Sequence, residues 1–339
     1  MFFPLDEQLR VSGVSWSEML AKAAVWLYGQ VEDDLAEQIL LKIGGMCVTD
    51  TSIWRLAQKW GERFRVLEAA ETATSMLVPL RDGIVRGAGP IAQRMGVAMD
   101  GGMINVRDEG WKELKVGCVF EAALCGQAGT PEEEVHAVNN SYAAILGGPQ
   151  TFGQTVWAEA SRRQFPRAQE SVVMGDGAPW IWNLALEHFG TSRQAVDWYH
   201  ATQHLYSVAH LAFGEGTAEA MRWAKGMETP LYQGHAQRIA TAIHGLAERF
   251  PKRAQALHTE ADYFHRNRRR MQYMELREDG FPIGSGMVES GCKRYRTRFA
   301  GPGMRWSRAG ARRLLPVRTA ILNRRFDQIW ATLNNSPPN

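Results

Sequence analysis

The chain has 339 residues, of which 45% are apolar and 22% charged, and its formal net charge is +3. This composition is typical of a soluble globular protein with room for two or three modules. The start, MFFPLDEQLR, lacks the basic region of a signal peptide, and no run approaches the roughly 18 apolar residues of a membrane span. We therefore expect a cytoplasmic protein that does not enter a membrane.

Residues 1–65 predict a helical module. Their apolar residues recur at helical spacing, and a glycine pair beginning at Gly44 separates two of the helices. Helix, glycine-containing turn and helix form the outline of a helix-turn-helix, which would turn Arg55 and Lys59 outward to contact DNA. Short helical hairpins are common, so the pattern alone leaves DNA binding open. Residues 66–92 predict a connector with a helical part.

Residues 93–200 predict the first part of an α/β core. Apolar β-type runs and helical periodicity indicate five strands, at Arg94–Val106, Leu114–Ala123, Tyr142–Leu146, Ser171–Met174 and Ala195–His200, and two helices, at Gln150–Phe165 and Trp180–Phe189. The order β-β-β-α-β-α-β is that of the RNase H-like fold, with a mixed sheet, although many α/β proteins have similar patterns.

The remainder of the chain predicts an interruption and a return to that core. Residues 201–278 are helical in pattern and indicate an all-helical domain inserted into the RNase H-like core. Residues 279–330 are expected to complete the core, with a helix that begins near Glu289 and an arginine-rich face. Residues 331–339 predict a disordered tail.

Three acidic residues lie in distinctive settings. Asp100 in VAMDGG and Asp176 in VVMGDGAPWIW follow apolar β-type runs, and Glu289 in IGSGMVESGCKRYRTR lies near a predicted helix start. Two strand-borne aspartates and one helix-borne glutamate form a triad of the kind that binds two divalent ions for phosphoryl transfer on nucleic acid. Carboxylates are hard oxygen ligands, which favours Mg²⁺ or Mn²⁺. An aspartate beside glycine is also a common turn residue, so a turn remains an alternative for both aspartates.

The segment from Gly291 to Arg325 contains eleven Lys or Arg and no Asp or Glu. Ten of the eleven are Arg, and aromatic residues are interleaved with them. Arginine forks match phosphates and stack on bases, so the segment favours nucleic acid as partner over a merely solvated basic face. The residues expected to contact DNA here are Lys293, Arg294, Arg296, Arg298, Arg305 and Trp306.

Four motifs together resemble a known family. DGG at Asp100, GDGAPWIW around Asp176, DWYHATQHL from Asp197, and GSGMVESGCKRYRTRF through GPGMRW are similar in order and spacing to the DDE transposases of bacterial insertion sequences. The similarity is to the Kra-type family, a distant relative of the eukaryotic Mutator-like transposases. It assigns the catalytic, metal-binding positions to Asp100, Asp176 and Glu289. It also matches Asp197 and His200 to the D-x-x-H element of the family, which would support the ligands or contact DNA.

The resemblance implies a transposase that cleaves and rejoins double-stranded DNA at the ends of an insertion sequence. Such an enzyme would use two Mg²⁺ or Mn²⁺ ions and act as a homodimer or higher oligomer on DNA. Two alternatives remain open. One is an RNase H-like structure-selective nuclease, such as a junction resolvase, and the other is a helix-turn-helix regulator with an inactive nuclease-like domain.

Members of this family usually carry a cysteine-rich, zinc-binding segment upstream of an FPLDE motif, and this chain begins at that junction. The cysteines present are expected to be free thiols, too scattered to form a zinc site: Cys47, Cys118, Cys125 and Cys292. We therefore expect an N-terminus truncated within this junction and DNA binding that is mainly non-specific.

Overall fold

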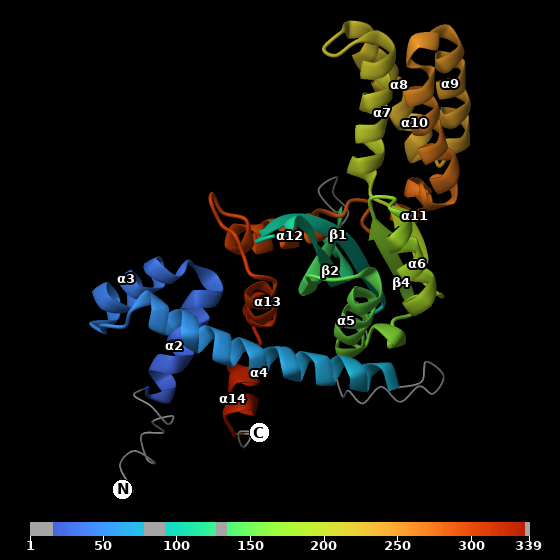
Figure 1. The fold of residues 1–339 in the computed structure, drawn as a ribbon. Helices are drawn as coiled ribbons and strands as arrows, with labels where there is room; N and C mark the ends of the chain where they lie inside the picture. Colours follow the sequence, from blue (N-terminus) through green and yellow to red (C-terminus); the bar gives the residue numbers. More distant parts are fainter. Residues whose placement is uncertain (1–15, 78–91, 127–133, 336–339) are drawn as a thin grey trace, which may run out of the picture.

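The computed structural model describes residues 16–77, 92–126 and 134–335, and within these ranges the chain is an α/β protein with one five-stranded mixed sheet (Figure 1). The N-terminal helices lie on one side of the sheet, and a group of helices from residues 198–278 projects away on another side. Among the described residues, no helix is both long and apolar enough to cross a membrane.

The sheet is built around its first strand. Strands β1 (Arg94–Val106), β2 (Gly110–Cys125) and β3 (Glu134–Ile145) form an antiparallel meander, and β4 (Glu170–Gly175) and β5 (Arg193–Val196) continue the sheet in parallel with β1. The strand order is β3-β2-β1-β4-β5. The prediction of an α/β protein with a mixed sheet is confirmed, and the first strand has the predicted bounds.

Four helices cover the sheet, two on each face. They are α12 (Gly286–Phe299) and α13 (Arg308–Leu322) on one face, and α5 (Pro149–Arg162) and α6 (Pro179–His188) on the other. In β1, Ala98 faces the first pair of helices and Val97 faces the second, because successive side chains alternate across a strand. A strand that is buried on both faces reads as a continuous apolar run, which explains the Val97-Ala98-Met99 signal.

The N-terminal helices are α2 (Glu18–Gln30), α3 (Asp33–Gly44) and α4 (Asp50–Leu77). Gly45 ends α3 with φ of 63°, a left-handed conformation that glycine adopts without strain. Helix α4 runs well beyond residue 65, so the segment expected to be a connector begins inside a continuous helix. Trp60 of α4 stacks on Trp330 at a centroid distance of 3.8 Å, and this contact fastens α4 to the C-terminal helix.

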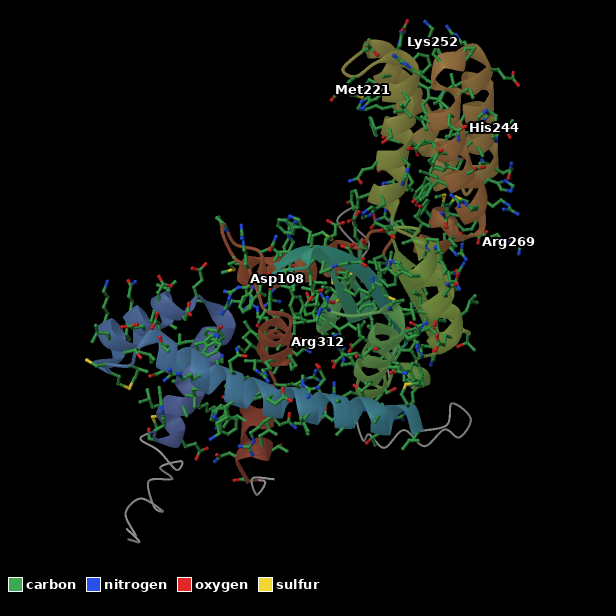
Figure 2. The ribbon with its side chains drawn as sticks, viewed as in Figure 1. Asp108, Met221, His244, Lys252, Arg269 and Arg312 are labelled. Atoms are coloured by element: carbon green, nitrogen blue, oxygen red, sulfur yellow. The ribbon has the colours of Figure 1, made fainter. Side chains whose placement is uncertain are left out.

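Five helices separate β5 from α12: α7 (Trp198–Phe213), α8 (Ala218–Tyr232), α9 (Ala236–Arg249), α10 (Ala254–Asn267) and α11 (Tyr273–Glu278). Lys252 lies at the end of this helical segment that is far from the sheet, and Arg269 lies at the near end (Figure 2). The predicted strand Ala195–His200 is wrong beyond Val196, because the Asp197 side chain accepts the His200 N–H and starts α7 instead.

The chain ends with α14 (Phe326–Asn335). The prediction of a disordered tail from residue 331 is therefore wrong for residues 331–335, and residues 336–339 lie outside the described ranges. Trp330 and Leu333 are buried on one face of this helix, which explains why it continues to Asn335.

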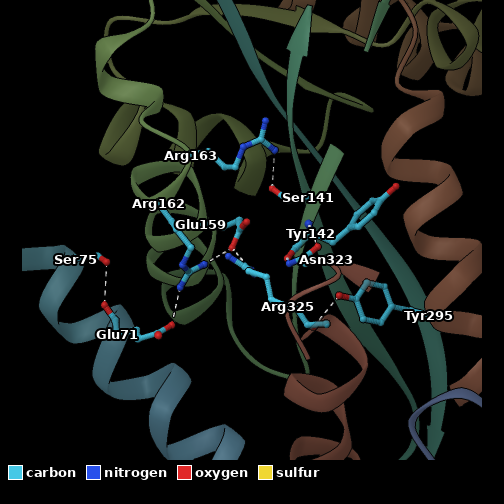
Figure 3. Close-up of polar contacts among 11 residues, drawn as sticks. Glu71, Ser75, Ser141, Tyr142, Glu159, Arg162, Arg163, Tyr295, Asn323 and Arg325 are labelled. Carbon is cyan, nitrogen blue, oxygen red and sulfur yellow. Dashed lines mark hydrogen bonds and ion pairs between the residues drawn. The ribbon is translucent and has the colours of Figure 1, made fainter. Parts of the chain in front are cut away.

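Charged side chains join α4, α5 and the C-terminal segment (Figure 3). Glu159 of α5 is 3% exposed and accepts hydrogen bonds from Arg162 and, at 2.6 Å, from Arg325. Arg162 also pairs with Glu71 of α4 at 2.6 Å. A buried carboxylate without partners costs several kcal/mol, so these two arginines stabilise Glu159 in this position.

Candidate active site

Three aspartates lie at one level of three neighbouring parallel strands. Asp100 lies within β1, Asp176 directly follows β4, and Asp197 directly follows β5. Across the sheet, Ala98 pairs with Met174, and Met174 pairs with Ala195. Each aspartate comes two residues after one of these paired positions. Since β1, β4 and β5 run in the same direction, their aspartates lie side by side at the level where β4 and β5 end.

Asp100 is half-buried beneath α12. Its Oδ1 accepts the Gly101 N–H at 2.6 Å, and the thiol of Cys292 in α12 hydrogen-bonds its carboxylate. Burial raises the pKa of the Asp100 carboxyl above its ordinary value, and the negative charge of Asp176 raises it further. Asp100 is therefore a carboxylate held in an environment that already carries excess negative charge.

Asp176 is held by the turn after β4 and by α10. Its Oδ1 accepts the Ala178 N–H at 2.8 Å, and its backbone carbonyl accepts the Tyr263 hydroxyl at 2.9 Å. Gly177 has φ of 106°, and a Cβ there would come within 2.7 Å of the Tyr263 ring. The Gly-Asp-Gly sequence thus lets the helical segment approach the strand end closely.

Buried Asp197 pairs with half-buried His200 at the start of α7. The Asp197 carboxylate is fully buried and accepts the N–H groups of His200, at 2.8 Å, and Ser285. His200 Nδ1 lies 3.1 Å from the same carboxylate. Burial alone would raise the pKa of Asp197, but these hydrogen bonds outweigh burial and hold the pKa below its ordinary value.

His200 lies in a negative electrostatic environment. Its hydrogen bond to Asp197 raises the pKa of the imidazole above 6.5, and the charges of Asp176 and Asp100 raise it further. Because Nδ1 is engaged with Asp197, Nε2 is the ring nitrogen left to meet a ligand or a proton.

Glu289 reaches the same place from α12. It lies in the first turn of that helix, half-buried, as the sequence predicted for a glutamate near a helix start. Asp197, His200 and Glu289 each offer one ligand atom, and these atoms lie within 4.8 Å of one another. This group could hold a metal ion. Asp100 and Asp176 are outside this group but close enough for their charges to act on His200.

Ser285 explains how Glu289 comes to this position. The hydrogen bond from the Ser285 N–H to Asp197 fixes the residue that precedes α12. The Trp198 N–H also donates to the Ile283 carbonyl at 3.0 Å, which ties the same approach segment to the start of α7. The buried carboxylate of Asp197 therefore sets where α12 begins, and with it the height of Glu289 above the sheet.

The residues expected to contact DNA divide into exposed and buried groups. Those with exposed side chains are Arg55 and Lys59 on α4, Lys293, Arg294 and Arg296 on α12, and Arg305. Arg298 is only 2% exposed, and its Nε donates to the Tyr28 carbonyl at 2.8 Å. The prediction that Arg298 belongs to an exposed DNA-binding face is wrong, because the last turn of α12 packs against α2.

The Trp306 side chain also packs against the interior of the protein. Its indole N–H donates to the Phe299 carbonyl at 2.9 Å, and its ring lies 5.1 Å from the Phe299 ring. Trp306 is half-buried, and its predicted contact with DNA stays a prediction. Other arginines of the basic segment are paired with acids of the same chain, as Arg308 is with Glu109.

Two residues at the site were not singled out from the sequence. Cys292 lies three residues after Glu289, so helical periodicity could have placed both on the side of α12 that meets the sheet. Tyr263 had no local signal, because it reaches Asp176 only through the packing of α10.

No protein-family model matches this chain, and no curated protein shows significant similarity to it.

Proposed function

We propose that the protein is a DDE transposase, which cleaves and rejoins DNA strands at the ends of an insertion sequence with Mg²⁺ or Mn²⁺. One observation carries the proposal: aspartates from three neighbouring parallel strands lie at one level of the sheet, and Glu289 of α12 lies close to one of them, Asp197. Phosphoryl transfer on nucleic acid needs such a group of carboxylates from separate elements.

The strand arrangement supports an RNase H-like core. Strand β1 is central, antiparallel to β2 and parallel to β4, and the order is β3-β2-β1-β4-β5. The helical segment α7 to α11 stands between Asp176 and Glu289, where the sequence pattern predicted an inserted domain. These features favour the transposase over an unrelated α/β enzyme.

The donor set fits hard divalent cations. Asp100, Asp176 and Glu289 would supply the metal ligands, with Asp197 and His200 beside them, and oxygen ligands suit Mg²⁺ and Mn²⁺. The pKa of Asp100 is raised mainly by burial and further by the charge of Asp176, and a bound cation would offset both effects. When bound, paired divalent ions activate the attacking oxygen and stabilise the leaving oxygen.

The chain's own residues position these groups and the DNA. Asp197 holds His200 by Nδ1, so a protonated Nε2 can donate to a phosphate oxygen at the site. Lys293, Arg294 and Arg296 lie on the exposed side of the helix that carries Glu289. Their charges would hold the DNA backbone next to the carboxylates and set its position without reading its sequence.

Cleavage of DNA that contains the terminal repeats flanking the gene tests the proposal. We expect the protein to cut and join this DNA with Mg²⁺ or Mn²⁺, and Asp100→Asn, Asp176→Asn and Glu289→Gln each to abolish cutting while DNA binding remains. Glu248→Gln, an exposed acid of α9, is the matched control and should cut normally.

The products separate this function from its alternatives. Cutting of branched DNA without joining at the repeats would indicate a structure-selective nuclease. Binding of DNA without cutting under any metal condition would indicate a regulator.

A further inference from the structure

A groove of about 460 Å³ lies between the N-terminal helices and the loop that joins α12 to α13. Its aromatic lining consists of Tyr28, Trp54 and Trp306. Trp54 is 44% exposed, which is unusual for a tryptophan without a partner surface. The groove is separate from the carboxylates of the candidate active site.

Six charged side chains line this groove in equal numbers of each sign. The acids are Glu32, Asp33 and Asp50, and the bases are Arg107, Arg298 and Arg305. Among the ion pairs of the described residues, none joins any of these six side chains to another charged group. The groove therefore presents charges of both signs around a space that a ligand can occupy.

Arg298 lies between two of these rings at the inner wall of the groove. Its guanidinium lies 4.7 Å from the Tyr28 ring centroid and 5.0 Å from that of Trp306, and the side chain is 2% exposed. Its Nε donates to the Tyr28 carbonyl, and the charges of Glu32 and Asp33 act on it. The stacked, planar guanidinium matches a phosphate oxygen pair in geometry as well as in charge.

We infer that this groove binds a nucleotide, and specifically an unpaired nucleotide of the DNA on which the enzyme acts, an inference that rests on the proposed function. The phosphate lies toward the arginines, and the base stacks on Trp54. The amino groups of the base donate to the carboxylates on the opposite wall. A ligand with an anionic end, a flat ring and hydrogen-bond donors uses all three kinds of lining residue.

Helix α12 connects the groove to the candidate active site. Glu289 lies in its first turn and Arg298 in its last, nine residues apart. At 1.5 Å per residue the two are about 13 Å apart along the helix axis, which equals roughly four nucleotide steps of 3.4 Å. The exposed Arg294 and Arg296 lie between them. Nine residues make about two and a half turns, so the two side chains leave α12 on opposite sides. Measured along the axis alone, the groove lies about four nucleotides from the bond that is cut.

Binding of DNA with a single-stranded overhang tests the inference. 2-Aminopurine is placed singly at each of the first eight overhang positions, and its fluorescence is followed in EDTA, where no cleavage occurs. We expect quenching to be strongest near the fourth position. Because stacking of a base on an aromatic side chain is worth about 1–3 kcal/mol, Trp54→Ala should weaken binding roughly 5- to 140-fold.

Trp26→Ala is the matched control, because Trp26 is 42% exposed on α2 but does not line the groove. Equal affinities of the Trp26→Ala and Trp54→Ala variants for the overhang would overturn the inference. Two results would overturn the assignment to an unpaired nucleotide of DNA. One is binding of fully paired duplex that depends on Trp54 as strongly as binding of the overhang does. The other is free deoxyadenosine monophosphate that competes for the site as well as the overhang. Wild-type protein that binds the overhang through Trp54 in EDTA but never cuts DNA with metal would contradict the proposed function and leave the nucleotide site standing.

Discussion

Replacing Asp197 with Asn should destabilise the protein strongly, although the two side chains have nearly the same shape. The Asp197 carboxylate is fully buried and accepts the backbone N–H groups of His200 and Ser285 as well as His200 Nδ1. An asparagine keeps one oxygen and turns an NH₂ group toward the other donors. One buried N–H then lacks an acceptor.

The magnitude follows from these contacts. An orphaned buried N–H costs about 1–3 kcal/mol, and each remaining hydrogen bond loses roughly 1 kcal/mol when its acceptor is no longer charged. Removal of a buried negative charge offsets part of this loss. We expect Asp197→Asn to lower the free energy of unfolding by about 3 kcal/mol at pH 7.

Urea unfolding followed by far-UV circular dichroism measures this difference, and its pH dependence provides a second check. The folded-state pKa of Asp197 is lowered, so its stabilising contribution is fully present above the ordinary value of 3.8 and is lost as the pH falls through the folded-state pKa. The difference between wild type and Asp197→Asn should therefore shrink below pH 3.8.

Glu289→Gln is the control, because this carboxylate is half-buried at the site and should change stability by no more than about 0.5 kcal/mol while cleavage is lost. A loss below about 1 kcal/mol for Asp197→Asn, or a loss that does not depend on pH, would refute the role of Asp197 as the anchor of α12.

Three further outcomes are expected. Glu159→Ala should lower the free energy of unfolding by about 3–5 kcal/mol in urea titrations, because Arg162 and Arg325 lose a buried partner; a loss like that of an exposed pair would contradict this. NMR titration of the metal-free protein should give His200 a pKa above 6.5 that falls in Asp197→Asn, and an unchanged pKa would contradict the hydrogen-bond explanation. In DNA-binding titrations, the slope of log K against log salt should flatten by up to ~0.9 per lost phosphate contact when Lys293, Arg294 and Arg296 are neutralised. The matched triple at exposed positions of the helical segment should leave this slope unchanged: Arg222, Lys225 and Lys252.

The sequence was most informative where a local pattern determines the structure. The run before Asp100 is apolar on both faces, so it indicated a buried strand whose bounds agree with β1. It was less informative where a single side chain redirects the backbone. Residues Ala195–His200 have β-type character, but the Asp197 carboxylate caps a helix and ends the strand at Val196.

Long-range packing explains the remaining differences. The basic segment predicted an arginine-rich DNA face, but charge in a sequence does not show which arginines turn inward. Arg298 and Arg318 are 2% and 6% exposed, and both donate to backbone carbonyls of α2. The contact of Tyr263 with Asp176 joins residues 87 positions apart, and the sequence carries no period or motif that could predict it.

Manganese binding followed by electron paramagnetic resonance tests most directly whether Asp100, Asp176 and Glu289 form one metal centre. Two Mn²⁺ ions should bind to the wild-type protein on DNA, and Asp100→Asn and Glu289→Gln should each remove at least one of them. Wild-type protein that binds no Mn²⁺ on DNA, or binds it equally in both variants, would contradict the proposed centre.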